Sequence, residues 1–169
     1  APAWAGPSGY VAPPVAPAPA FCWENVNGID AKARVVLPAP YRAGFADGGY
    51  LTVWQERCLA AMPTPEFHAY VDHIARQLGT GIEEDPGEVL RELWARSVEL
   101  KLDVQGRLSL PDALRSHVGI GSEVRFVGFG RRVELWPAVV SAADEDERRD
   151  LRATIALLQA DYDVPRHGS

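Results

Sequence analysis

The chain has 169 residues, of which 47% are hydrophobic and 24% are charged, a composition typical of a globular protein with room for one domain or two small modules. No apolar run approaches the roughly 20 residues that cross a bilayer, and the first residues lack the regions of a secretory signal, so we expect neither feature. The net charge of −6 is unfavourable for binding nucleic acid. The acidic residues are concentrated in residues 63–102 and 141–169, however, whereas residues 21–62 are neutral and residues 103–140 carry one net positive charge.

The first segment, residues 1–20, is uncharged and consists largely of alanine and proline. Proline blocks both helix interiors and sheet ladders. We therefore expect this segment to be an extended, mobile arm outside the folded part of the chain, and we assign no function to it.

The main organisational feature is an internal repeat at a shift of 73 residues. In both copies an aspartate is followed four residues later by an arginine and then by Leu-Pro. The coincident pairs are Asp30 and Asp103, Arg34 and Arg107, Leu37 and Leu110, Pro38 and Pro111, and Arg42 and Arg115. One such unit alone could not bury its apolar face, so we expect one module in residues 21–63 and a second in residues 97–140.

The local structure of a module is clearest in the second copy. Residues 97–103 alternate apolar and polar side chains, which predicts a half-buried strand. Gln105 and Gly106 then supply a turn, and the alternation resumes at Leu108 and Leu110 in a return strand. A short helix that begins after Pro111 and two further strands complete the module, over residues 112–117, 123–129 and 132–136.

Longer helices are expected outside the modules. Apolar side chains at helical spacing predict them over residues 65–78, 86–96 and 142–162. The first two form a connecting segment, residues 64–96, and the third belongs to a C-terminal helix and tail, residues 141–169. In that tail Leu151, Ile155 and Leu158 share one helix face, and the acidic start of the helix suits its dipole.

The Asp-x-x-x-Arg loop, the Leu-Pro that follows it and the short helix after it (Leu110, Pro111, Leu114 and Arg115) resemble a DNA-binding module of the AbrB/SpoVT type. Two such modules joined by a helical hairpin, from about Phe21 to the C-terminal helix, resemble the MraZ family. The resemblance implies a mixed α+β, mainly β fold with two tandem AbrB/SpoVT-like double-psi or swapped-hairpin β-barrel modules. It also implies a ring-like homo-oligomer that binds double-stranded DNA at repeated operator boxes.

In function, the resemblance implies a sequence-specific transcriptional regulator that represses the division and cell-wall gene cluster, in the cytoplasm at the nucleoid. It implies no enzyme activity, no cofactor and no small-molecule substrate. The sequence departs from the family pattern at Ala33, where the family usually has glycine, and at Trp23 and Asn25, where the upstream strand usually has glycine and tyrosine. Alanine carries a steric penalty if position 33 needs a positive φ, which would weaken DNA binding.

The first-copy loop supplies the strongest DNA-binding candidates, Lys32 and Arg34. Both lie on a turn between strands, so their charged groups can project together. A guanidinium can bind a guanine edge or a phosphate through two hydrogen bonds, and a lysine adds a mobile point charge. The alternative, in which Arg34 pairs with Asp30 across its own turn, stays open, and the recurrence of this aspartate in both copies indicates a structural role for it.

The second-copy loop lacks a second cation, so we expect Arg107 mainly to pair with Asp103, with Gly106 as the structural turn residue. Arg107 nevertheless remains a DNA-binding candidate. Arg42 and Arg115 follow the start of a helix in their copies, and they are candidates for contacts with phosphates or with a neighbouring subunit.

No other chemistry is indicated. His68 and His73 are five residues apart rather than the four that align two ligands on a helix, and Cys22 and Cys58 have no metal-ligand or disulfide spacing, so we expect no metal site and a reducing compartment. No catalytic constellation is visible. Two other functions stay open: an oligomeric regulator that has lost DNA binding and acts on protein partners, and an antitoxin-like protein whose C-terminal helix binds a toxin.

Overall fold

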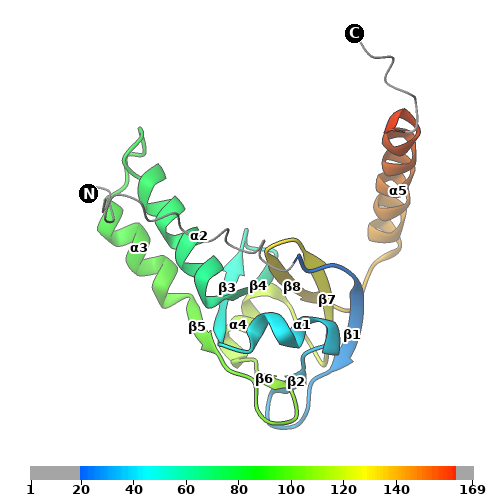
Figure 1. The fold of residues 1–169 in the computed structure, drawn as a ribbon, viewed down its shortest axis with the longest axis horizontal. Coiled ribbons are helices and arrows are strands. Elements are labelled where there is room, and N and C mark those ends of the chain that lie inside the picture. The colour runs from blue at the N-terminus through cyan, green and yellow to red at the C-terminus, as the bar shows by residue number, and fades with distance from the viewer. Residues whose placement is uncertain (1–19, 163–169) are drawn as a thin grey trace, which may run out of the picture.

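The computed structural model describes residues 20–162, so the mobile arm expected at residues 1–20 lies almost wholly outside the described residues. The fold is mixed α+β and mainly β, as the sequence indicated (Figure 1). The elements of the first half are β1 (Glu24–Gly28), β2 (Arg34–Val36), α1 (Ala39–Arg42), the 3-10 turn η1 (Ala43–Phe45), β3 (Gly49–Trp54), β4 (Cys58–Pro63) and α2 (Thr64–Gln77). Those of the second half are α3 (Pro86–Ala95), β5 (Ser97–Leu100), β6 (Arg107–Ser109), α4 (Asp112–Val118), β7 (Glu123–Phe129), β8 (Arg132–Pro137) and α5 (Ala142–Tyr162).

The strands of the two copies are interleaved. A six-stranded sheet has the order β1-β7-β8-β4-β3-β5, and β2 pairs with β6 in a separate two-stranded ribbon. The first strand of each copy pairs with the third strand of the other copy, as β1 with β7 and β5 with β3. Exchanging the two copies leaves the strand order unchanged, so the repeat appears in space as a pseudo-two-fold arrangement. The edge strands of the six-stranded sheet are β1 and β5, and this sheet is not closed into a barrel.

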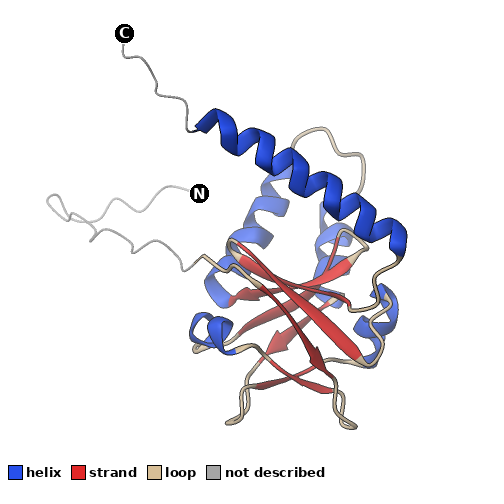
Figure 2. Ribbon diagram, turned by 90° about the vertical axis from the view of Figure 1, so that its right-hand side faces the viewer, coloured by secondary structure: helices blue, strands red, loops and turns tan. Residues whose placement is uncertain are grey.

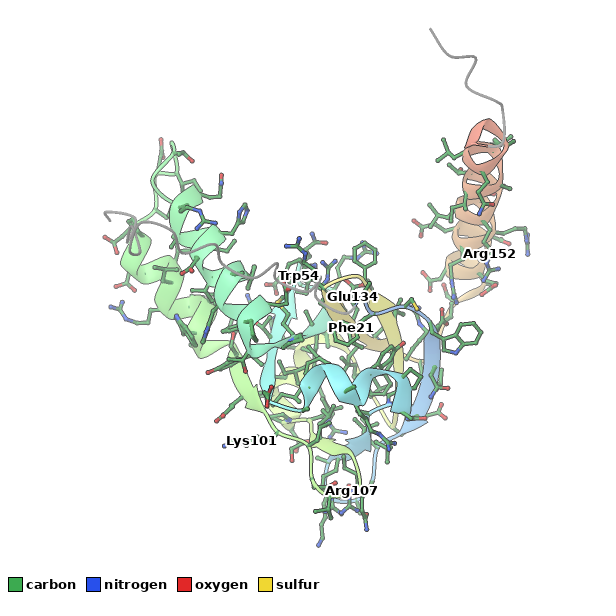
Figure 3. All side chains as sticks on the ribbon, in the orientation of Figure 1. Phe21, Trp54, Lys101, Arg107, Glu134 and Arg152 are labelled. Carbon is green, nitrogen blue, oxygen red and sulfur yellow. The ribbon has the colours of Figure 1, made fainter. Side chains whose placement is uncertain are left out.

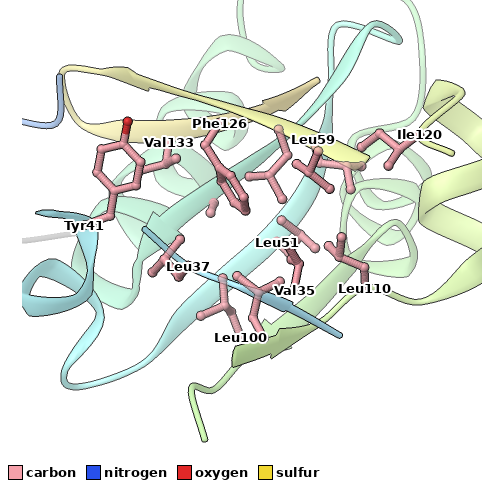
Figure 4. Packing of buried hydrophobic residues seen from close by; sticks show 14 of the residues in the cluster. Val35, Leu37, Tyr41, Leu51, Leu59, Leu100, Leu110, Ile120, Phe126 and Val133 are labelled. Atoms are coloured by element: carbon pink, nitrogen blue, oxygen red, sulfur yellow. The ribbon is translucent and has the colours of Figure 1, made fainter. Parts of the chain in front are cut away.

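The hydrophobic core is shared by both copies. Val35 and Leu108, which coincide in the sequence repeat, are directly paired in the β2–β6 ribbon and are both 1% exposed. Leu37, Leu110 and Phe126 are fully buried in the same cluster (Figure 4). Each such side chain contributes about 1.5–3 kcal/mol when it is fully buried. Because these side chains come from both copies, neither copy could bury its apolar face alone.

The helices between the copies form an antiparallel hairpin, α2–α3, that packs on one side of the sheet (Figure 1). Phe67 of α2 is fully buried and stacks on Tyr50 of β3, with ring centroids 4.3 Å apart. At the base of the hairpin, Arg96 donates a 2.8 Å hydrogen bond to Glu56, and the ring of His117 shares a hydrogen bond with the same carboxylate. These bonds lower the pKa of Glu56 to about 2, and the bond from Arg96 is the largest cause.

Expected and observed element bounds agree closely where the apolar pattern is strong. The strand expected over residues 97–103 ends at Leu100, however, because the next residues turn into a loop that the carboxylate of Asp103 organises. The short helix expected over residues 112–117 continues to Val118.

The C-terminal helix α5 covers residues 142–162, as expected, and extends away from the sheet (Figure 2). Its attachment to the sheet includes an ion pair of 2.8 Å from Arg148 to Glu24 of β1. None of the helices within residues 20–162 has the length and apolar character to cross a membrane.

Candidate nucleic-acid interface

Two loops protrude together at one end of the molecule, and we call this end the tip. Loop 1 covers residues 30–34 and loop 2 covers residues 103–107. They lead into opposite ends of the β2–β6 ribbon, and both point away from the six-stranded sheet (Figures 1 and 2). Arg107 lies at this end, whereas Trp54 and Glu134 lie at the opposite side of the sheet (Figure 3).

Loop 1 is built around the carboxylate of Asp30. Its Oδ1 accepts hydrogen bonds of 2.9 Å from the backbone N–H groups of Lys32 and Arg34, and its Oδ2 accepts one of 2.9 Å from Nε of Arg34. Mainly through the backbone bond from Arg34, these contacts lower the pKa of the Asp30 carboxyl. The loop is therefore held rigidly by a side chain that sequence analysis placed in a structural role.

Loop 2 repeats this arrangement. Oδ1 of Asp103 accepts from the backbone N–H groups of Gln105 and Arg107 at 2.9 Å, and Oδ2 accepts from Nε of Arg107 at 2.7 Å. The backbone bond from Arg107 is the largest of the causes that lower the pKa of Asp103. The structure thus contains the Asp103–Arg107 pair that we expected, and it contains the equivalent Asp30–Arg34 pair that we left as an alternative.

Each loop is also bonded to the segment that follows the other loop. The N–H of Leu37 donates to the carbonyl of Gly106 at 2.9 Å, and the N–H of Leu110 donates to the carbonyl of Ala33 at 2.8 Å. These two bonds are equivalent under the pseudo-two-fold arrangement. They fix the spacing of the loops, so the tip is one rigid surface.

The pairing of the two loop arginines leaves them able to contact a ligand. Arg34 and Arg107 use Nε for their aspartates, and their side chains remain 28% and 26% exposed. Within residues 20–162 their terminal amino groups make no side-chain hydrogen bond. Lys32 of loop 1 is exposed, and only its backbone takes part in the loop. The tip therefore presents two preorganised guanidinium groups and one ammonium group.

The other two candidates lie at the flanks of the tip and are half-buried. Arg42 donates from Nε to the carbonyl of Leu37 at 2.9 Å and packs over Gly106, where a Cβ would lie 2.7 Å from that Nε. Arg115 donates to Asp112 at 2.5 Å and to the carbonyl of Gly121 at 3.4 Å. The structure therefore gives both arginines intramolecular partners.

Position 33 has a positive φ, the backbone conformation in which alanine is less favourable than the glycine usual in the family. Ala33 has φ = 56° and its counterpart Gly106 has φ = 76°. Left-handed backbone costs an L-residue roughly 1–2 kcal/mol, whereas glycine adopts it without a Cβ clash. Loop 1 nevertheless keeps the hydrogen bonds of loop 2, so the alanine strains the loop without changing its shape.

A second cationic surface, which sequence analysis missed, lies on the far side of the sheet from the tip. Arg57 and Arg125 lie over the ring of Trp136, with distances of 5.3 and 5.6 Å to its centroid. Arg132 lies 4.3 Å from the ring centroid of Trp54. The alternation of polar residues along β7 and β8 was the signal that could have placed these side chains on one face.

Within residues 20–162 no cluster of three or more histidine, cysteine, aspartate or glutamate residues could hold a metal ion. Both cysteines are unbridged, with Cys22 exposed and Cys58 buried. Burial is the largest cause that raises the pKa of the Cys58 thiol to about 12, so this thiol stays protonated at neutral pH.

Comparison with known proteins identifies the family. The family model described as "MraZ protein, putative antitoxin-like" matches residues 24–84 and 93–140, more than half of the chain. A transcriptional regulator MraZ of Symbiobacterium thermophilum is 34% identical over 134 residues, which cover 79% of this chain and 95% of that protein. Proteins of the same name from Salinispora tropica (34% identity, 78% of this chain, 94% of theirs) and Bifidobacterium longum (37%, 64% and 71%) are also similar. The chain belongs to the MraZ family.

Proposed function

We propose that this chain is a sequence-specific transcriptional regulator that binds double-stranded DNA through its tip. The observation that carries the proposal is a pair of rigid loops at one protruding end, one with Lys32 and Arg34 and the other with Arg107. The names of the relatives, transcriptional regulators, support the same function.

The physical basis is a preorganised set of donors. Arginine can bind guanine O6 and N7 or a phosphate through two hydrogen bonds, and because Asp30 and Asp103 already orient the guanidinium groups, little side-chain entropy is lost on binding. Lys32 adds a phosphate contact that carries no sequence information. Arg34 and Arg107 therefore supply base contacts, and Lys32 supplies affinity.

Assembly completes the proposal. The exchange of strands between the copies supports two swapped-hairpin modules of the AbrB/SpoVT type, here fused into one interleaved unit. A ring-like homo-oligomer would present the tip repeatedly along a duplex, so that weak single contacts add up at repeated operator boxes. We place this activity in the cytoplasm at the nucleoid, with the division and cell-wall gene cluster as the target.

The test is a DNA-shift titration at low and physiological salt, with the DNA upstream of the chain's own gene compared with a scrambled duplex and the mass of the protein measured alongside. We expect the upstream DNA to be preferred and the affinity to fall steeply with salt, because the net charge of −6 opposes binding away from the tip. Equal binding of both duplexes by the assembled protein would contradict the proposal.

A second candidate function is regulation through a protein partner, as in an antitoxin. It is favoured by the strained Ala33 in loop 1 and by the exposed apolar side chains of α5. If it is correct, the chain binds neither duplex preferentially, and α5 carries the partner contact.

A further inference from the structure

Loop 2 of the tip carries the most exposed of the large hydrophobic side chains in residues 20–162. Val104 is 104% exposed, so its side chain makes almost no contact with the rest of the described chain. The next value is 89%, for Val139 between β8 and α5. Loop 1 has no counterpart of the same size, because the repeat places Ala31 at this position. A large apolar group therefore faces water at the protruding end of one copy only.

The backbone of loop 2 holds Val104 at the apex of a turn. The N–H of Gly106 donates to the carbonyl of Asp103 at 2.9 Å, which closes a β-turn whose two central residues are Val104 and Gln105. Oδ1 of Asp103 accepts from the N–H of Gln105 at 2.9 Å, and the N–H of Asp103 donates to the carbonyl of Arg107 at 3.0 Å. The apex is therefore fixed on both sides, and both of its side chains are exposed.

The folding of loop 2 gives no reason for a valine at this apex. Turn positions favour glycine, proline, asparagine, aspartate and serine, whereas β-branched residues suit strands. Val104 also gains no burial from the fold. For binding, however, a valine is well suited, since its restricted χ1 angle means that little side-chain entropy is lost when a ligand covers it. A ligand explains this position better than the fold does.

An A·T base pair offers groups that match both apex side chains. In the major groove thymine exposes its C5 methyl group, which contacts apolar side chains, and adenine exposes N6 and N7, which a glutamine amide binds through two hydrogen bonds. Within residues 20–162 the side-chain amide of Gln105 makes no hydrogen bond, so it is available for this contact. We infer that loop 2 reads A·T base pairs, with Val104 against the thymine methyl group and Gln105 on the adenine.

The corresponding residues of loop 1 suit a different contact. Its apex is closed in the same way, by a 3.1 Å bond from the N–H of Ala33 to the carbonyl of Asp30, and its central residues are Ala31 and Lys32. Alanine offers less apolar surface, and lysine has donors but no acceptor, so it cannot bind both N6 and N7 of adenine. The inference rests on the proposed function, and it assigns the selection of A·T pairs to loop 2.

The test removes the methyl group from the DNA and the valine from the protein. The upstream DNA is prepared with thymine or with uracil, which pairs in the same way but lacks the C5 methyl group, and both duplexes are titrated with the full chain. We expect uracil to weaken binding by about fourfold for each methyl group that Val104 covers, the effect of one apolar carbon group lost from a contact. For Val104→Ala, uracil should weaken binding by less than about twofold.

Val139→Ala is the matched control, because it removes an exposed valine that lies away from the tip. This variant should show the same weakening by uracil as the parent chain. Since both valines are exposed, neither substitution should alter the fold, which circular dichroism would verify.

A second set of titrations tests Gln105. Each A·T pair of the upstream DNA is replaced in turn by a G·C pair. At a position that loop 2 reads, we expect the parent chain to lose roughly 5- to 150-fold in affinity. Gln105→Ala should lose most of this discrimination at that position and keep the parent's preferences elsewhere.

Three results would overturn this inference and leave the proposed function intact, provided that the parent chain still prefers the upstream DNA to a scrambled duplex. They are no effect of uracil on the parent chain, equal effects of uracil on the parent chain and Val104→Ala, and unchanged A·T discrimination by Gln105→Ala. A parent chain that binds the upstream and scrambled DNA equally would contradict the proposed function and this inference together.

Discussion

The two loops of the tip share one structural frame and differ in the residues that it holds. In both loops an aspartate binds two backbone N–H groups and Nε of an arginine, with nearly the same distances. Between these residues, loop 1 has Lys32 and Ala33, whereas loop 2 has Gln105 and Gly106. The shared frame explains how the tip is rigid, and the differences indicate where the copies have separate tasks.

The difference at the turn residue extends to the flanking arginines. Arg42 packs over Gly106, where a Cβ would lie only 2.7 Å from its Nε. Under the pseudo-two-fold arrangement Arg115 is the counterpart of Arg42, and Ala33 carries the methyl group that Gly106 lacks. Arg115 instead turns to Asp112, and its Nε is buried with no hydrogen-bond partner among the described residues. The two copies thus differ at two positions of the repeat, Ala33 against Gly106 and Asp112 against Ala39, and the two halves of the tip are unequal.

The largest effect is expected from removing the loop arginines. Arg34→Ala should weaken DNA binding by roughly 10- to 100-fold, about 1–3 kcal/mol, and Arg107→Ala should weaken it less, because only loop 1 adds a neighbouring cation. Each substitution removes one of two equivalent arginine–aspartate pairs, so the difference between the two losses isolates the DNA contact. Shift titrations that give equal losses would show that the two loops bind alike.

The next effect concerns the stability of loop 2. Gly106→Ala places a methyl group against the Arg42 side chain at a positive φ, so it should lower the free energy of unfolding by about 1–3 kcal/mol. Urea denaturation measures this loss. Gly130→Ala is the matched control, since Gly130 also has a positive φ, of 66°, but a Cβ there meets nothing within 4 Å, so it should show only the backbone strain and lose less than Gly106→Ala. Equal losses in both variants would show that Arg42 readily moves aside.

The loop aspartates predict an acid-sensitive tip. A carboxyl whose pKa is lowered in the folded protein stabilises the fold above its unfolded pKa, and this contribution disappears as the pH falls through the folded value. The pKa values of Asp30 and Asp103 are both lowered from 3.8, so the loss should occur below about pH 4. Urea denaturation at several pH values should show a smaller acid-induced loss for Asp30→Asn and Asp103→Asn. An exposed control, Asp47→Asn, should behave as the parent chain does.

The smallest effect is expected at position 33. Ala33→Gly removes the strain of an alanine in the left-handed conformation, which stabilises the fold by roughly 1–2 kcal/mol. It also gives the unfolded chain more backbone entropy, which destabilises the fold by roughly 0.5–1 kcal/mol. The free energy of unfolding should therefore rise by about 0.5 kcal/mol, measured in urea. A fall in stability would mean that the methyl group makes packing contacts that outweigh its strain.

Sequence patterns predicted the elements better than their partners. β7 and α5 were placed with the bounds that the structure gives, because their apolar residues follow one period throughout. The alternation through Leu102 extended β5 too far, since the hydrogen bonds of Asp103 decide where the loop begins. A period of two indicates which face of a strand is buried but not which strand lies beside it, so the pairing of β1 with β7 was beyond prediction.

The candidate site shows the same limit. The spacing of Asp30 and Arg34 allowed both a structural pair and a DNA contact, and only coordinates reveal that Nε serves the pair while the terminal amino groups remain exposed to a ligand. Arg42 was expected near phosphates, but its position over Gly106 depends on a close approach between the two copies. Contacts of this kind have no signature in local sequence.

The most direct test of the tip as the DNA-binding surface is the salt dependence of binding for two single charge removals. Lys32→Ala takes an exposed charge from the tip without touching the hydrogen bonds of loop 1, and Arg131→Ala takes an exposed charge from the far side of the sheet. In a plot of log affinity against log salt concentration, each lost phosphate contact reduces the slope by about 0.9. We predict a reduced slope for Lys32→Ala and an unchanged slope for Arg131→Ala. The opposite result would place the DNA on the arginine and tryptophan surface and contradict this account.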